Sequence, residues 1–598
     1  MIGELISVLL IIFWLVKVYK DAYKKPVENF PPGPPSLPIW GAYFIIAAKE
    51  INNLGGAMRK FADEYKTKVV GMYLGMFPSI VANDPALIKE VLTREEFDGR
   101  MDIVVGRLRS YWKRLGIFFT DDYFWHVQRR FSLRYMRDFG FGRRDATLES
   151  VVDHEIREML DMITTGPKYP AEKELVKGDL ISLQHIFVVP FLNGLLHVYS
   201  RMTVPRPDYH VLWELARKGL IFQSGTNDFG GALSLTPWLK DVLPKWSGYS
   251  ALKAGNEAIR DFMTKLVEEA VATYNEAHDR HFIDVYIRKM KEEMKTKDRT
   301  TFSIDQLVLT LVDYAFPTAT AVESTLSFLV ERILLQPEIQ DKVHEEIDRV
   351  VGRDRTPTLN DKPNMPYTEA CLREIMRYES LVPLGVPHRA TQNTTLGGYN
   401  IPQVGLWGDP ENFRPERFIV NGKLKVSTDK SLPFGAGAYI IFMYFYRKSS
   451  SVLIHAHTWW VPTVLYGSKR PCSTTLPLSL ITPRSGKTSE GSPFHSLQVR
   501  GKNDRENRTV DFLHESNRCG WNFNLKQLVE SRYFSLTGRR LCAGETYARQ
   551  SMFQVFSAFM QAFHISTPDG KPLKKPFKRI QGIITMLPNY WIRVTPRT

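Results

Sequence analysis

The apolar segment at residues 303–335 constrains the fold of this chain most. Its run LVLTLVDYAFPTATAVESTLSFLVERILL is almost continuously apolar, which predicts one long helix through the middle of a core. Ser303 stands where an N-cap belongs, and Gln306, three residues on, is its expected capping-box partner. Pro317 is expected to distort the middle of this helix, because proline lacks an N–H group and clashes with the preceding turn. Pro337 is expected to open the next helix.

The rest of the chain has a predominantly helical pattern. Apolar residues recur about every 3.6 positions in long stretches between residues 55 and 380, for instance at 251–274 and 341–351. Alternating, strand-like spacing is largely confined to residues 69–91. The pattern predicts a mainly α fold with a minor β-sheet.

The amino terminus carries the uncharged apolar run LISVLLIIFWLV at residues 5–16, followed by Lys17, Lys20, Lys24 and Lys25. Positive charge after the run is typical of an uncleaved signal anchor, and it predicts that the remainder stays in the cytosol. We assign residues 1–25 to this single transmembrane anchor helix and its basic flank. Residues 26–40 contain PPGPP, which prevents a helix and predicts a stiff elbow. The alternative is a buried first helix of a soluble domain.

Composition excludes several classes of protein. The chain has 598 residues, with 79 Lys and Arg against 64 Asp and Glu, and this excess of +15 suits an anionic membrane surface or an acidic protein partner. The positive charge is spread along the chain, so no nucleic-acid partner is expected. The four cysteines show no CxxC pair, which excludes a disulfide scaffold and a zinc finger. Any sulfur chemistry would therefore use a single thiolate.

Four short patterns follow one another along the chain: Trp125 and Arg129 in WHVQRRF, Glu374 and Arg377 in CLREIMRYES, Arg417 in FRPERF, and Cys542 in GRRLCAGE. Each alone has an ordinary explanation, such as packing or a surface ion pair. Together, and over nearly the whole length, they resemble the cytochromes P450, the haem-thiolate monooxygenases. The anchor with its PPGPP elbow, RRFSLRYMRDFGFG and GRRLCAGETYARQ resemble the microsomal animal type, and are most similar to insect members.

This resemblance implies a P450 fold for residues 41–598, with haem b as cofactor. Cys542 would be the axial ligand of the iron, because a thiolate ligand favours O–O cleavage, and Gly544 would help to aim N–H groups at the sulfur. The haem propionates would be held by residues that supply cations or N–H donors, namely Trp125, Arg129, His388, Arg540 and Arg100. Glu374, Arg377 and Arg417 match a structural triad that is expected to control folding and haem retention.

Two departures from the family pattern concern the reaction and the pocket. Where the family places an acid and then a threonine in the central helix to relay protons, this chain has Thr320 and Ala321. Thr320 is the remaining candidate for a catalytic role there, with Thr318 as another group that could position water. At residues 404–406 only three residues separate IPQ from WGDPENFRPERF, too few for a typical strand.

A larger discontinuity splits the expected haem loop. SLPFGAG ends at Gly437 and RRLCAGE resumes at Arg539, so residues 438–538 stand inside the motif, and removing them restores PFGAGRRLCAGE. We interpret this insert and the shortening at 404–406 as gene-model errors. The competing interpretation is a genuine regulatory insertion.

The resemblance implies a membrane-anchored monooxygenase that inserts one oxygen atom of O2 into a lipophilic small molecule. Its electrons would come from NADPH–cytochrome P450 reductase, for which Arg130, Arg134 and Arg137 offer a basic docking face. The enzyme would lie in the endoplasmic reticulum membrane with its catalytic domain facing the cytosol. Two alternatives stay open: a haem-thiolate isomerase or peroxygenase, which needs no O2 activation, and a non-functional product of a mis-assembled gene model.

Overall fold

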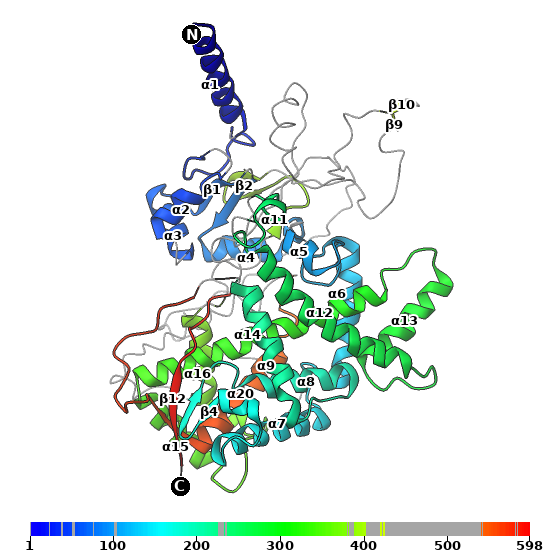
Figure 1. Ribbon diagram of the computed structural model, residues 1–598, viewed down its shortest axis with the longest axis vertical. Helices are drawn as coiled ribbons and strands as arrows, with labels where there is room; N and C mark the ends of the chain where they lie inside the picture. Colours follow the sequence, from blue (N-terminus) through cyan, green and yellow to red (C-terminus); the bar gives the residue numbers. More distant parts are fainter. Residues whose placement is uncertain are drawn as a thin grey trace, which may run out of the picture.

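The computed structural model (Figure 1) describes most of the chain outside the region of the insert. The described residues are 2–22, 24–37, 40–50, 54–75, 77–100, 104–224, 233, 236–379, 381, 388–401, 419–420, 423–424, 540, 542–580, 582 and 584–597. Arg417, the shortened segment 404–406 and the insert 438–538 lie outside them, and so does the side chain of Arg377.

Helices form most of the described structure, as the sequence pattern predicts. The α-helices are α1 (Ile2–Ala22), α2 (Tyr43–Glu50), α3 (Leu54–Glu64), α4 (Pro85–Thr93), α5 (Val104–Arg109), α6 (Asp122–Met136), α7 (Ala146–Thr164), α8 (Val188–Ser200), α9 (Tyr209–Ser224), α11 (Leu239–Val242), α12 (Tyr249–Ala272), α13 (Phe282–Thr296), α14 (Ile304–Leu335), α15 (Glu338–Val350), α16 (Pro366–Tyr378) and α20 (Glu545–Ala562). The 3-10 turns are η1 (Glu95–Phe97), η2 (Arg137–Phe139), η3 (Pro170–Glu174), η4 (Arg206–Asp208) and η5 (Lys362–Asn364).

The strands form small antiparallel sheets. They are β1 (Val69–Leu74), β2 (Phe77–Ala82), β3 (Gly99–Arg100), β4 (Val176–Lys177), β5 (Leu180–Ser182), β6 (His388–Arg389), β7 (Thr394–Leu396), β8 (Tyr399–Ile401), β9 (Ile419–Val420), β10 (Lys423–Leu424), β11 (Phe563–Ser566) and β12 (Trp591–Pro596). The largest described sheet has the order β11-β12-β5-β4, and the pairs β1-β2, β3-β6, β7-β8 and β9-β10 stand apart from it.

The strand-like region at 69–91 is shorter than its pattern suggests. The hairpin β1-β2 ends at Ala82, and residues 85–93 form helix α4. The Asp84 side chain accepts hydrogen bonds from the backbone N–H groups of Ala86 and Leu87, and Pro85 follows as the first helical residue. An N-cap and a first-turn proline thus outweigh the alternating pattern.

The central helix α14 begins as predicted, but one half of its capping box is absent. Ser303 Oγ accepts a hydrogen bond from the Gln306 N–H at 3.1 Å. The Gln306 side chain, however, accepts from the Gly116 N–H at 2.7 Å and donates to the Gly116 oxygen, so it fastens a loop to the helix. The helix continues through Pro317 to Leu335, and α15 starts directly after Pro337.

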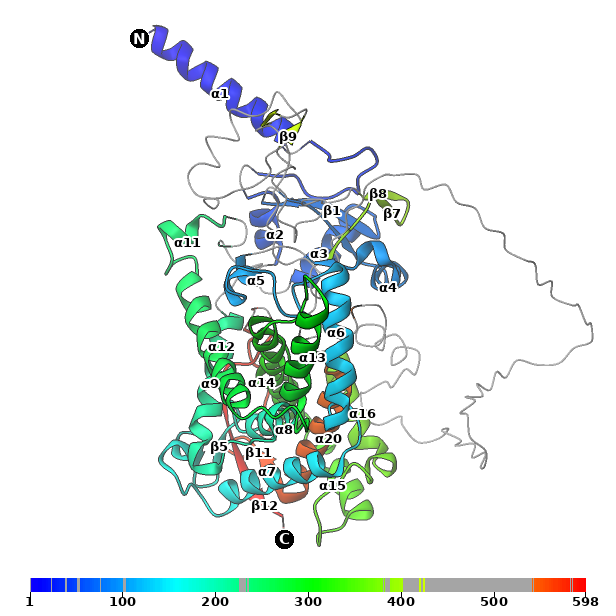
Figure 2. The same cartoon turned by 90° about the vertical axis from the view of Figure 1, so that its right-hand side faces the viewer.

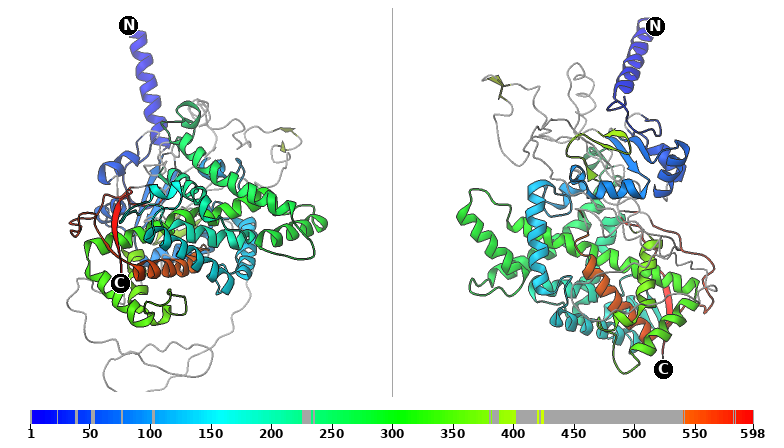
Figure 3. Two further views of the ribbon diagram at one scale, coloured as in Figure 1. Left: turned by 60° about the horizontal axis from the view of Figure 1, so that its bottom comes forward. Right: turned by 180° about the vertical axis from the view of Figure 1, so that it is seen from behind.

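Two hydrophobic cores meet at the middle of α14. The larger core joins the helices of the main body, and the smaller one lies around the hairpin β1-β2 with α2 and α3. Phe316 packs against both cores, and its ring meets that of Phe222 on α9 edge to face at 4.8 Å. Figure 2 shows α14 among the helices of the body, and Figure 3 shows α20 as the orange helix alongside the green ones. Helix α20 packs against α7, α14, α15 and α16.

The first helix projects away from the body, as Figures 1 and 2 both show. Residues 9–16 all carry large apolar side chains, and all of them are exposed. Among the helices that the structure describes, none is both long enough and apolar enough to cross a membrane. The proline-rich segment that follows packs on β1, where the Gly71 N–H donates to the Pro32 oxygen at 2.9 Å.

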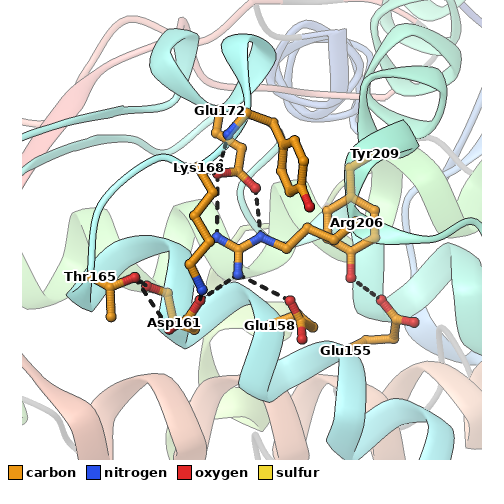
Figure 4. Close-up of polar contacts among 9 residues, drawn as sticks. Glu155, Glu158, Asp161, Thr165, Lys168, Glu172, Arg206 and Tyr209 are labelled. Atoms are coloured by element: carbon orange, nitrogen blue, oxygen red, sulfur yellow. Dashed lines mark hydrogen bonds and ion pairs between the residues drawn. The ribbon is translucent and has the colours of Figure 1, made fainter.

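A buried arginine joins α7, η3 and η4 (Figure 4). Arg206 donates to Glu172 at 2.7 Å and to Glu158 at 3.0 Å, and it also contacts Asp161. The side chains of Arg206 and Glu172 are almost fully buried, so each depends on the other for its charge balance. Hydrogen bonds from Lys168 and Arg206 lower the pKa of the Asp161 carboxyl to about 2.

We expect Arg206→Leu to lower the free energy of unfolding by about 3 kcal/mol, because it leaves the buried Glu172 carboxylate without the positive charge that balances it, with only the backbone N–H groups of Lys168 and Tyr169 as donors. The matched control is Arg217→Leu on α9, whose side chain is 48% exposed and pairs with Glu214 at the surface. That variant should cost less than about 1 kcal/mol. Urea unfolding measures both values, and equal losses would contradict the account.

Candidate functional site

Cys542 lies just before the amino-terminal end of α20, and Gly544 is the N-cap of that helix. The residue is exposed, yet the atoms around its sulfur withdraw the thiol from water, and this desolvation raises the thiol pKa. The backbone N–H groups of Gly544 and Glu545, together with Arg129, offset part of this rise in the thiol pKa, whereas the negative charge of the Glu545 carboxylate adds to it. The position of Gly544 therefore agrees with the expectation that backbone N–H groups face this sulfur.

The other cysteine of the described chain is a different kind of group. Cys371 is buried in α16, and burial raises the pKa of its thiol to about 12. It is a protonated core thiol at neutral pH.

The five residues predicted to hold propionates come from four separate segments and lie close together. Arg540 stacks on the Trp125 ring, with its guanidinium carbon 3.6 Å from the ring centre, and Arg129 lies over the same ring at 5.7 Å. Arg100 and His388 pair directly across strands β3 and β6. We call Arg100, Arg129, His388 and Arg540 the cation cluster.

All four members of the cation cluster have lowered pKa values, and burial is the largest cause for each. Burial, and then repulsion from Arg100, lowers the pKa of Arg540 to about 8. Burial also lowers the pKa of Arg100 to about 10, although Asp121 and Asp98 offset part of the effect. A guanidinium stays charged in proteins, so the direction of these pKa shifts indicates that a negative group would be favoured beside the cluster.

His388 fits a propionate less simply than the arginines do. Its Nδ1 lies 2.6 Å from the Phe97 carbonyl oxygen, which can only accept, so Nδ1 must carry a proton. A neutral His388 then has no second N–H group to offer to a carboxylate. Burial, followed by repulsion from Arg100, lowers the pKa of His388. A carboxylate beside the ring would favour the protonated imidazolium, which has a second N–H group to donate. His388 can therefore hold a carboxylate only in this protonated form.

The sequence did not reveal Asp121, a buried carboxylate that holds several of the arginines beside this cluster in place. Asp121 accepts hydrogen bonds from Arg389 at 2.8 Å, from Arg114 at 2.9 Å and from the Arg100 backbone N–H at 2.9 Å. Burial alone would raise the pKa of the Asp121 carboxyl, but Arg114 and Arg389 outweigh it and hold the pKa at about 2. Its place directly before α6 is a signal for a helix cap, but its side chain does not cap the helix.

The face of α14 at its middle is partly accessible. Between Gln306 and Glu331, only Phe316, Pro317 and Ala321 are not fully buried, and they lie within about one helical turn of each other. Thr320 and Thr318 offer no free hydroxyl proton, because each donates to a carbonyl of its own helix, at 2.9 Å to Phe316 and at 2.8 Å to Tyr314. The Thr320 oxygen also accepts a hydrogen bond from Gln223 of α9.

The predicted triad is visible only in part. Glu374 lies in α16 and is half-buried, and Arg377 lies one turn further along the same helix. Because the Arg377 side chain and Arg417 lie outside the described residues, their grouping stays a prediction.

Comparison with known proteins identifies the family. The sequence model described as "Cytochrome P450" matches residues 31–183 and 226–440, more than half of the chain. A "Farnesoate epoxidase" of Bombyx mori is 27% identical over 423 residues, which cover 68% of this chain and 82% of the relative. "Probable cytochrome P450 303a1" of Drosophila melanogaster is 30% identical over 451 residues, covering 71% and 86%. "Cytochrome P450 2B2" of Rattus norvegicus is 29% identical over 456 residues, covering 73% and 87%.

The chain therefore belongs to the cytochrome P450 family, and it is a haem-binding monooxygenase with a mainly helical fold and a minor sheet. The family match stops at residue 440, close to the point where the haem loop is interrupted, so Cys542 and α20 lie beyond it.

The residues around Cys542 fit a haem group by their charge. Two buried carboxylates, Asp98 and Asp121, face a larger number of guanidinium groups, namely Arg100, Arg114, Arg129, Arg389 and Arg540. A dianion such as the two propionates of haem would neutralise most of this excess. An accessible thiol that receives two backbone N–H groups is a suitable donor for iron.

Proposed function

We propose that Cys542 is the axial ligand of the haem iron and that the cation cluster, with Trp125, holds the propionates. The single observation that carries this proposal is the excess of buried positive charge close to an accessible thiol that receives N–H groups. When bound through a thiolate, haem supplies the electron-rich iron that favours O–O cleavage. Arg540 and Arg100 orient the group by its carboxylates, and the N–H groups of Gly544 and Glu545 stabilise negative charge on the sulfur.

We propose that the substrate lies beside Phe316, Pro317 and Ala321 of α14. These partly accessible side chains sit where the two hydrophobic cores meet, and they are apolar, which suits a lipophilic small molecule. Farnesoate, named in the description of the Bombyx mori relative, is the first substrate to test.

We further propose that α1 anchors the enzyme in the endoplasmic reticulum membrane, with the catalytic part in the cytosol. The exposed apolar side chains of residues 9–16, on a helix that projects from the body, support this proposal, and so do the lysines that follow them.

We propose NADPH–cytochrome P450 reductase as the electron donor. Arg130 and Arg134 on α6 and Arg137 directly after it are all exposed, and α6 carries the haem-site residues Trp125 and Arg129. A positive face on this helix would attract an acidic partner close to the haem.

The test of haem ligation is the carbon monoxide difference spectrum of the reduced protein, taken on the full chain and on a version without residues 438–538. We expect the shortened version to give the red-shifted thiolate band and the full chain to give little of it, because a long insertion next to the ligand disturbs the loop that holds the sulfur. Reductase-dependent turnover of NADPH should follow the same order.

Two results would contradict this expectation. A full band from the full chain would show that residues 438–538 are a genuine, tolerated insertion. If neither version gives the band, the proposal fails for the chain as written, and the shortening at 404–406 is the next feature to restore before Cys542 is tested again.

A further inference from the structure

Helix α9 packs against the middle of α14, and a glycine stands at the point of contact. A Cβ atom at Gly219 would lie 3.0 Å from the Thr320 methyl group, so glycine permits this approach. On the other side, a Cβ atom at Gly582 would lie 2.2 Å from the Gln223 backbone oxygen. Gln223 is therefore held between α14 and the carboxyl-terminal segment, with little freedom to change its position.

The hydrogen bonds of Thr320 fix which end of the Gln223 amide faces α14. The Thr320 hydroxyl donates its only hydrogen to the Phe316 oxygen at 2.9 Å, so toward Gln223 it can only accept. The Gln223 amide nitrogen donates to it. The amide oxygen, Oε1, must therefore point away from the Thr320 hydroxyl.

This amide oxygen is buried and has no partner. Gln223 is 2% exposed, and its Oε1 atom has no hydrogen-bond donor among the described residues. Buried polar atoms in folded proteins are nearly always hydrogen-bonded, either to protein or to a bound molecule. An unsatisfied acceptor on a side chain that is bound to Thr320 is therefore evidence for a bound hydrogen-bond donor.

We propose that Gln223 Oε1 positions an O–H donor between α9 and α14, close to Thr320, and thereby replaces the acid and threonine that α14 lacks. The inference rests on the proposed haem site. The donor is either an ordered water molecule or a hydroxyl group of the substrate. A neutral amide gains or loses no proton near neutral pH, so Gln223 orients the donor without transferring a proton itself.

The test compares Gln223→Met, which keeps the length of the side chain and removes its hydrogen bonds, with Gln223→Glu and with the control Asn256→Leu. Asn256 lies on α12, is 3% exposed, and also has a buried amide atom without a partner. All variants are made in the form of the chain that gives the thiolate band. Two readouts are used: spin-state titration with farnesol and with its methyl ether, and peroxide released per NADPH consumed with reductase.

If the donor is a substrate hydroxyl, Gln223→Met weakens farnesol binding about threefold to tenfold, the effect of one hydrogen bond, and leaves binding of the methyl ether unchanged. If the donor is water, both probes bind as before, and Gln223→Met raises the peroxide released per NADPH at least about twofold. Gln223→Glu should make peroxide release depend on pH, because a carboxyl group titrates where the amide does not.

The proposal is overturned if both Gln223 variants match Asn256→Leu in binding and in peroxide release. A missing thiolate band in the parent chain is a different failure, because it refutes the haem site itself. A band in the parent together with unchanged Gln223 variants refutes only the role of Gln223.

Discussion

The variant Cys542→Ala will lose the red-shifted carbon monoxide band completely, whereas Cys371→Ala will keep it. Cys542 is exposed, and the N–H groups of Gly544 and Glu545 offset part of the rise that desolvation causes in its thiol pKa. Binding to iron would hold the sulfur as the thiolate. Cys371 is a buried thiol whose pKa is raised to about 12, so it has neither access nor negative charge. The two variants remove the same side chain and separate ligation from general damage.

Cys472 and Cys519 both lie in the insert 438–538, outside the described residues, so the version without the insert lacks them. A thiolate band from that version cannot come from either cysteine, and Cys542→Ala should abolish it. A band that only the full chain gives, and that survives Cys542→Ala, would place the iron ligand within the insert.

Asp121→Asn should be the most damaging conservative change outside the ligand. The substitution keeps the shape of the side chain and removes the charge that neutralises Arg114 and Arg389, so two largely buried guanidinium groups lose their anion. Removal of one partner from a buried charged network costs about 3–5 kcal/mol of unfolding free energy. Because Asp121 also holds the Arg100 N–H, we expect haem occupancy at a fixed haem concentration to fall as well.

The free energy of unfolding should depend on pH through Asp121, and the direction of that dependence can be predicted. The pKa of Asp121 is held at about 2 in the folded chain, whereas an aspartate in an unfolded chain titrates near pH 3.9. Its stabilising contribution is thus complete above about pH 4 and is lost as the pH falls toward 2. Asp121→Asn should lack this part of the acid-induced destabilisation. Asp122→Asn, at the exposed neighbouring residue, serves as the control and should keep it.

Most helices were predictable because their residues repeat a local pattern. Ser303 caps α14 as expected, and the predicted helix at 251–274 is α12 at Tyr249–Ala272. Local signals also mislead where a tertiary contact competes. Gln306 has the spacing of a capping box, yet its side chain fastens Gly116, because a buried backbone group needs a partner more than an exposed helix end does.

The site was predictable where one residue type performs one chemical task. Cys542 and the cation cluster stand in motifs, and the structure brings the members of the cluster together from distant segments. Asp121 and Gln223 were missed because their roles depend on partners far along the chain, Arg389 and Thr320, which no spacing in the sequence reveals. The charge balance between Asp121 and its arginines, and the unpaired amide oxygen of Gln223, can be recognised only from the three-dimensional structure.

The position of β12 has a consequence for the order in which the chain can fold during synthesis. This strand lies between β5 and β11, with Ile592 opposite Ile181, which stands far earlier in the chain. A ribosome must therefore add all the residues between β5 and β12 before β5 can acquire this neighbour, so this part of the sheet forms late during synthesis. Until then β5 presents an unpaired edge that chaperones or proteases can recognise.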